Sequence, residues 1–168
     1  MILLIFVLIL YGVGSYFYYR AFNAHSDKSS FIKNDLHMKK KEEDIWLLEK
    51  SGYTIVSITN EHGLQLQGYC ITKSNSATWV ILVHGYMGKS DDLRLEAKRF
   101  YDLGFQVLLI DLQGHGASEG DVIGFGALDS NDLTLWVQFL NDQMSAKHII
   151  LYGVSMGAAS VMICSDQQ

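Results

Sequence analysis

KHIILYGVSMGAAS, residues 147–160, joins an apolar run to a serine between two glycines and then to a row of small residues. The apolar run favours a β-strand buried on both faces, and the small residues favour the start of a helix. A sharp turn between such elements needs neighbours without bulky side chains, which Gly153 and Gly157 supply. This arrangement predicts that Ser155 is a nucleophile, placed where the helix start favours a developing anion. The alternative is that Ser155 only caps the helix.

The segment HGYMG, residues 84–88, follows the apolar run TWVILV and predicts a loop that leaves a neighbouring strand. Acyl transfer to a serine needs two backbone N–H donors aimed at the oxyanion, one after the nucleophile and one from such a loop. The candidates are the amides of Met156 and Tyr86, and Gly85 leaves room for the backbone to approach the reacting carbon. His84 has two interpretations, a general base or a brace for the loop, and we expect the brace.

A third motif, DLQGHGASEG at residues 111–120, follows the apolar run FQVLLI. With the three motifs in this order, residues 53–165 resemble the α/β-hydrolase superfamily, especially its serine aminopeptidase-like and lysophospholipase-like branch. In that branch the third motif reads D-x-R-G-x-G-x-S, and Gln113 stands here in place of the arginine. The resemblance implies that Asp111 and His115 are structural or rim residues and not members of a catalytic triad.

The apolar pattern along the chain predicts the fold class. YTIVSITN and LQLQGYCIT flank the turn EHG and predict a hairpin, and three later apolar runs predict buried strands. Helical patterns lie at residues 126–144 and 90–104, where Ser90 or Asp91 is expected to cap the start and Gly104 the end. This alternation predicts an α/β fold with a mostly parallel, doubly wound sheet of the α/β-hydrolase type, truncated after about five strands.

The partners of the nucleophile are missing from their expected places. In the family that the chain resembles, an acid and then a histidine follow the nucleophile. The residues after Ser155 contain one acid, Asp166, and no histidine. Without a base, a serine hydroxyl is a poor nucleophile at neutral pH. We therefore expect the 168 residues to be the N-terminal part of a longer hydrolase, or a truncated gene product, and to be inactive alone. The alternative is a catalytically inactive protein that acts as a binding domain or has no activity.

The remaining histidines are not expected to replace the base. They lie in the linker, in a turn and before a strand, where we expect them to be solvated: His25, His37, His62 and His148. A nucleotide-binding module of the Rossmann type is disfavoured, because GHGASEG lacks the G-x-G-x-x-G spacing and opens onto a loop.

The first 19 residues, MILLIFVLILYGVGSYFYY, contain no charged side chain, and a helix of that length about spans the hydrocarbon core of a bilayer. Aromatic residues at 16–19 followed by Arg20 are typical of a membrane interface. We expect a single-pass anchor; a buried helix and a cleaved signal peptide are the alternatives, although no basic n-region precedes the apolar run. Basic residues after the span favour a cytoplasmic domain, without deciding the side of the membrane.

Three segments result: an anchor (1–20), a polar linker with an amphipathic helix (21–50) and the N-terminal part of a hydrolase domain (51–168). The net charge of −5 gives no electrostatic footprint for nucleic acid. Cys70 and Cys164 are predicted to be buried thiols. No metal or cofactor motif is present, and acyl transfer by this machinery needs neither. The expected partners are the membrane and a small-molecule, lipid-ester or peptide substrate.

Overall fold

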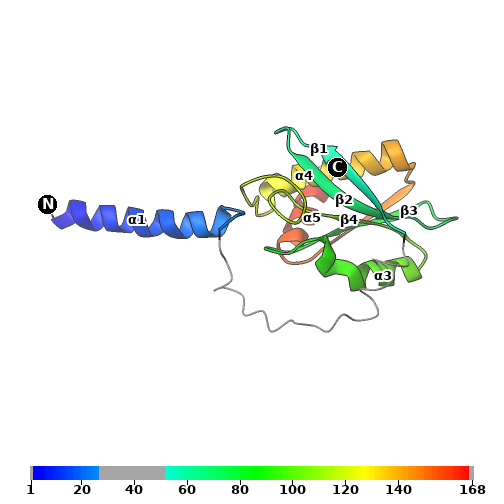
Figure 1. Ribbon diagram of the computed structural model, residues 1–168, viewed down its shortest axis with the longest axis horizontal. Helices are drawn as coiled ribbons and strands as arrows, with labels where there is room; N and C mark the ends of the chain where they lie inside the picture. The colour runs from blue at the N-terminus through cyan, green and yellow to red at the C-terminus, as the bar shows by residue number, and fades with distance from the viewer. Residues whose placement is uncertain (1, 27–51, 167–168) are drawn as a thin grey trace.

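The computed structural model describes residues 2–26 and 52–166 (Figure 1). Its five strands form one sheet in the order β1-β2-β4-β3-β5. The strands are β1 (Thr54–Thr59), β2 (Gln65–Ile71), β3 (Thr78–Val83), β4 (Gln106–Ile110) and β5 (His148–Gly153). The helices are α1 (Ile2–Phe22), α3 (Arg94–Asp102), α4 (Ala127–Met144) and α5 (Met156–Asp166). The predicted amphipathic helix of the linker lies outside the described residues.

The sheet is mixed. β1 and β2 form the predicted hairpin, and β2 also pairs antiparallel with β4. β4, β3 and β5 run parallel to one another. Because the carboxyl ends of parallel strands meet at one edge, the loops after these three strands lie together at that edge, which we call the carboxyl edge. The loops at the carboxyl edge begin at His84, Asp111 and Val154.

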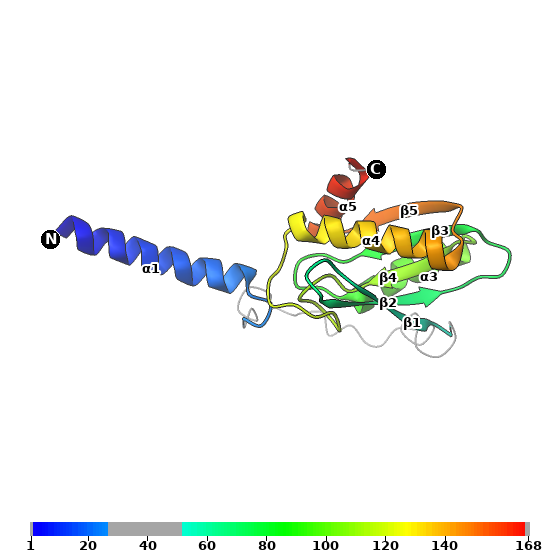
Figure 2. The same ribbon diagram turned by 90° about the horizontal axis from the view of Figure 1, so that it is seen from above.

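Helices cover both faces of the sheet (Figure 2). Successive side chains of a strand point to opposite faces. Ile81 and Val83 of β3 therefore belong to the cluster that α4 and α5 cover, together with Trp136 and Cys164. The alternate residues of β3 lie in a second cluster, against Ala97 of α3. Apolar side chains are thus buried on both faces of the sheet, which confirms the α/β class. Cys70 and Cys164 are buried free thiols, as predicted.

The helix that was predicted to start at residue 90 starts differently in the structure. Residues Ser90–Leu93 form a 3-10 turn before α3, and neither Ser90 nor Asp91 caps the helix through its side chain. Instead the Asp92 carboxylate accepts the backbone N–H of Lys89 at 3.0 Å. The backbone N–H of Ser90 donates to Asp111, so a tertiary contact determines this turn. At the other end Gly104 follows the helix with φ of +101°, as predicted.

The N-terminal helix α1 extends away from the sheet (Figure 1), and none of its residues is buried. It is long and apolar enough to cross a membrane. A signal sequence near an N-terminus has the same length and composition. Its 21 residues give a length of about 30 Å.

Candidate active site

Ser155 lies at the junction between β5 and α5. β5 ends at Gly153, α5 begins at Met156, and Ser155 between them is exposed. Its φ is +54°, in the left-handed region that L-residues seldom adopt. The N–H of Gly157 donates to the carbonyl of Val154 at 2.9 Å and closes the turn. The backbone strain that the strand-turn-helix motif implies is therefore present at the serine itself.

The two glycines of the motif allow the start of α5 to cross β5 and β3 closely. A Cβ on Gly153 would lie 2.3 Å from the carbonyl oxygen of Gly157. A Cβ on Gly157 would lie 2.4 Å from the carbonyl oxygen of Val83 and 2.5 Å from that of His84. The neighbouring atoms are backbone atoms, so no side-chain rotation relieves these clashes. Both positions require glycine for steric reasons.

The loop 84–88 lies directly beside Ser155. A Cβ on Gly85 would be 3.3 Å from the Cβ of Ser155 and 3.9 Å from its Oγ. Tyr86 follows Gly85 in this loop, and Met156 is the first residue of α5. An amide in the first turn of a helix has no intrahelical acceptor, and it carries the positive end of the helix dipole. Both candidate donor segments therefore lie next to the nucleophile candidate.

His84 is buried and braces the loop. With its ring proton on Nδ1, it donates to the carbonyl of Gly85 at 2.8 Å, and Nε2 accepts the N–H of Leu112 at 3.1 Å. Burial lowers the pKa of His84, which favours the neutral ring that these two bonds require. Both ring nitrogens thus bond to the backbone, and the ring links the loops that follow β3 and β4. This geometry suits a brace and leaves no nitrogen for the proton of Ser155.

Asp111 also links the segments that follow β3 and β4. Its carboxylate is buried and accepts the N–H groups of Ser90 at 2.7 Å and Ala117 at 2.9 Å. A Cβ on Gly116 would lie 2.2 Å from its carboxyl carbon. His115 is also buried, with Nδ1 3.0 Å from the carbonyl of Gln113. These contacts support the structural roles that the resemblance implies for Asp111 and His115.

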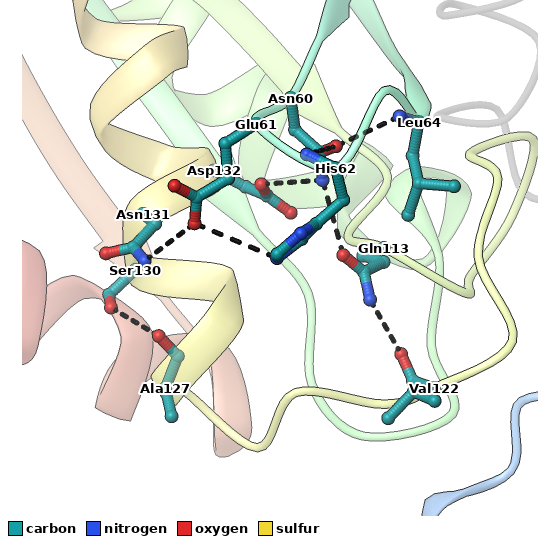
Figure 3. A network of polar contacts seen from close by, with 10 residues as sticks. All are labelled: Asn60, Glu61, His62, Leu64, Gln113, Val122, Ala127, Ser130, Asn131 and Asp132. Carbon is teal, nitrogen blue, oxygen red and sulfur yellow. Dashed lines mark hydrogen bonds and ion pairs between the residues drawn. The ribbon is translucent and has the colours of Figure 1, made fainter.

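Gln113, at the position of the family's arginine, belongs to a buried polar network (Figure 3). The side-chain amide of Asn60 donates to Oε1 of Gln113 at 3.3 Å and to Oδ1 of Asp132 at 3.1 Å. Oδ2 of Asp132 is buried without a hydrogen-bond partner among the described residues. Burial first, and the nearby Asp129 charge second, raise the pKa of Asp132 to about 6, although the bond from Asn60 opposes the shift. Sequence patterns did not predict this network, because Asn60 and Asp132 are distant along the chain.

The other candidate acids and bases lie away from Ser155 or in solvent. Asp166 and Ser155 lie at opposite ends of α5. His25 pairs with Asp121 at 2.9 Å on the surface, and His62 lies 3.8 Å from Glu61, also on the surface. His148 is exposed at the start of β5. The exposure of these three histidines confirms that they are solvated, and His37 lies outside the described residues.

A hollow of about 400 Å³ lies at the carboxyl edge, beside the residues that follow α1. Its lining includes Ala24, Lys89, His115 and Ile123. Ser155 does not line it. The hollow therefore neighbours the candidate site without containing the serine.

The fold and the strand-turn-helix geometry are those of an α/β hydrolase. The chain belongs to the serine aminopeptidase family S33, whose family model matches residues 74–168. Among the similar solved structures is an esterase from Pyrococcus furiosus, with 28% identity and a TM-score of 0.63, over 74% of this chain and 49% of the esterase. An α/β hydrolase from Penicillium is also similar, with 24% identity and a TM-score of 0.64. That match covers 69% of this chain and 42% of the Penicillium protein.

A curated relative, the uncharacterized protein YqkD of Bacillus subtilis, is 29% identical over 126 residues. The match covers 71% of this chain and 40% of the relative. The chain thus spans less than half of the curated relatives that it matches, and about half of the esterase. The esterase and the Penicillium protein are similar to the sheet and helices described above, and they confirm the α/β-hydrolase fold.

Proposed function

We propose that the chain is part of a membrane-anchored serine hydrolase that cleaves an ester or amide through an acyl-enzyme on Ser155. One observation carries the proposal: Ser155 has a φ of +54° at a strand-to-helix turn and faces the Gly85 loop. A serine in that conformation is exposed at the point where two backbone donors converge. The esterase among the structural relatives supports the same chemistry.

In the proposed reaction, Oγ of Ser155 attacks the carbonyl carbon of the substrate. The carbonyl oxygen becomes an oxyanion, which accepts hydrogen bonds from the amides of Tyr86 and Met156. The alcohol or amine then leaves with the proton that Ser155 lost, and water hydrolyses the acyl-enzyme to release the acid. His84 keeps the loop in place and does not move this proton, because the backbone holds both of its ring nitrogens.

The base and the acid are proposed to come from a further part of the fold. The relatives have this part, and it lies outside their match to these 168 residues. The match covers about half of the esterase, and the remaining half of that structure lies outside the match. On this proposal the 168 residues alone have little activity, because a serine without its base is a poor nucleophile. The alternative, an inactive binding domain, draws on the distance between Asp166 and Ser155 along α5.

The anchor is proposed to be α1, none of whose residues is buried. The substrate is a small molecule, a lipid ester or a peptide with a carbonyl that fits beside Gly85. No cofactor takes part in the proposed steps.

Covalent labelling with a fluorophosphonate tests the proposal on the full-length protein in its native membrane. We expect labelling that Ser155→Ala abolishes. The matched control is Ser165→Ala, which changes an exposed serine on the same helix and leaves the labelling unchanged. A folded full-length protein that takes no label, or label that persists in Ser155→Ala, would contradict the proposal and favour the inactive alternative.

A further inference from the structure

The end of α1 is built into the carboxyl edge of the domain. The N–H of Ile123 donates to the carbonyl of Phe22 at 2.8 Å, and the N–H of Ala24 donates to the carbonyl of Asp121 at 2.8 Å. An isolated antiparallel bridge joins Asn23 to Val122 between these bonds. The helix therefore continues into a short paired segment on the loop that follows β4.

The loop that carries a candidate oxyanion donor is bonded to the same helix end. The hydroxyl of Tyr86 donates to the carbonyl of Ala21, in the last turn of α1, at 2.8 Å. The ring of Tyr86 also packs on Phe125, with centroids 5.0 Å apart, and Phe125 packs on Phe22 at 4.8 Å. Phe22 stacks on Tyr18 at 4.6 Å. These four rings form a continuous aromatic row from the surface of α1 to the loop beside Ser155.

The position of α1 relates the candidate site to a membrane. The strand β5 points toward the side from which α1 projects (Figure 2), and α1 extends away from the carboxyl edge in both views. If α1 crosses a bilayer, the contacts of residues 21–26 therefore turn the carboxyl edge toward the surface of that bilayer.

Exposed apolar side chains lie on the edge that faces this way. Val122 is 45% exposed and Phe125 is 41% exposed, both on the loop that receives the end of α1. Val154, immediately before Ser155, is 39% exposed. Apolar side chains in such positions suit the boundary between headgroups and acyl chains better than they suit water.

We propose that the carboxyl edge rests on the membrane surface and that the substrate is a lipid ester taken from the bilayer. This inference rests on the proposed function, because it requires α1 as the anchor and Ser155 as the nucleophile. The lipid keeps its acyl chain near the bilayer while its ester carbonyl reaches Ser155. The ester C–O bond breaks, the lipid alcohol leaves with the proton from Ser155, and water releases the fatty acid from the acyl-enzyme.

The orientation is tested without reference to catalysis. The full-length protein is placed in phosphatidylcholine vesicles whose acyl chains carry bromine, a fluorescence quencher, and its emission is compared with that in unbrominated vesicles. Phe125→Trp and Val122→Trp each place an indole on the carboxyl edge, and the signal of the parent protein is subtracted. The control, Leu103→Trp, places an indole at a position 71% exposed that follows α3, away from the carboxyl edge.

We expect both edge variants to be quenched about threefold more strongly than Leu103→Trp, because an interfacial side chain lies near the acyl chains. Equal quenching in all three variants would overturn the membrane-facing orientation. Two edge variants are used because Phe125 packs on Phe22 and Tyr86, whereas Val122 has no part in that aromatic row.

The substrate class is tested by labelling of the full-length protein in unbrominated vesicles. We expect a fluorophosphonate with a long alkyl chain to label Ser155 at least about tenfold faster than a short-chain analogue, because each buried methylene favours the bilayer. Equal rates would overturn the lipid-ester substrate while leaving the nucleophile in place. No labelling by either reagent would overturn the proposed function and the lipid-ester substrate together, and the quenching experiment would still decide the orientation.

Discussion

Single atoms determine whether the candidate site can form. The hydrogen of Gly157 occupies the place where a methyl group would meet the carbonyl oxygens of Val83 and His84, at the end of β3. Ser155 adopts a backbone conformation that is unfavourable for a residue with a Cβ. Asp132 is a buried acid with one unpartnered oxygen in the described structure. Each of these residues has a measurable effect on stability that follows from its surroundings.

Gly157→Ala is expected to lower the free energy of unfolding by about 2–4 kcal/mol and to abolish fluorophosphonate labelling. The added Cβ would lie 2.4 Å from the carbonyl oxygen of Val83, so the start of α5 has to shift. Denaturant unfolding and labelling of the full-length protein measure the two effects. Gly12→Ala is the control, because a Cβ there meets no atom within 4 Å. Wild-type labelling by Gly157→Ala would refute the close crossing of α5 and β3.

Asp132→Asn is expected to raise the free energy of unfolding at pH 8 by about 1–3 kcal/mol. The pKa of Asp132 is raised to about 6 in the folded protein, so the folded state binds more protons than the unfolded state. The stabilisation from this excess is complete below the unfolded pKa near 4 and is lost as the pH rises through 6. The variant removes the part of this decline that Asp132 causes.

The measurement is denaturant unfolding between pH 4 and pH 8, with Asp142→Asn on the exposed side of α4 as the control. The other ionisable side chains whose charges act on Asp132 are Asp129, Glu61 and His62, and they stay in both variants. Burial raises the pKa of Asp129 too, so part of the decline with pH remains in Asp132→Asn. An unchanged pH profile would show that Asp132 titrates as an ordinary surface acid.

At the scale of elements, local patterns determined much of the fold. The hairpin, the three buried strands, a helix at 126–144 and the start of a helix after Ser155 were predicted from apolar spacing, turn residues and small residues, and the structure has each of them. The predicted cap at Ser90 or Asp91 was wrong, because Asp111 from a distant loop bonds the Ser90 amide. The network around Asp132 and the docking of α1 were not predicted for the same reason. Their contacts join residues distant in the chain, which local periodicity does not report.

Tyr86→Phe tests the contact between α1 and the loop beside Ser155. The change removes the hydroxyl bonded to Ala21 and keeps the ring that packs on Phe125. Loss of one hydrogen bond of about 1 kcal/mol is expected to slow the labelling of Ser155 by about fivefold if that bond positions the loop. The melting temperature of the domain is expected to fall by no more than about 5 °C.

The control for Tyr86→Phe is Tyr16→Phe, which removes an exposed hydroxyl from α1. A loss of labelling together with a clearly larger fall of the melting temperature in Tyr86→Phe would indicate general destabilisation, not positioning. An unchanged labelling rate would show that the loop holds its position without the helix.

At the scale of the whole molecule, the described structure combines an exposed apolar helix with a sheet whose last strand, β5, pairs on one side within the described residues. Beside that edge, α5 carries apolar side chains on its outer surface, with Met162 67% exposed. Open sheet edges and contiguous apolar surfaces favour association. The 168-residue chain is therefore expected to self-associate even when a detergent covers α1.

Met162→Lys is expected to reduce this association, because a charge on the outer surface of α5 opposes apolar contact. Light scattering of the 168-residue chain in detergent measures the effect. Leu103→Lys adds the same charge at an exposed apolar residue after α3 and serves as the control. Equal scattering by the two variants would place the association elsewhere on the molecule.

The docking of residues 21–26 also changes what the linker does. A polar segment between a helix and a domain usually acts as a tether, and its length then sets how far the domain can travel. Here α1 is already bonded to the domain before residue 27, through Ala21, Phe22 and Ala24. Residues 27–51 therefore connect two points of one docked unit. Insertions between residues 27 and 51 would leave the contacts of residues 21–24 with the domain unchanged. The distance between α1 and Ser155 would stay the same.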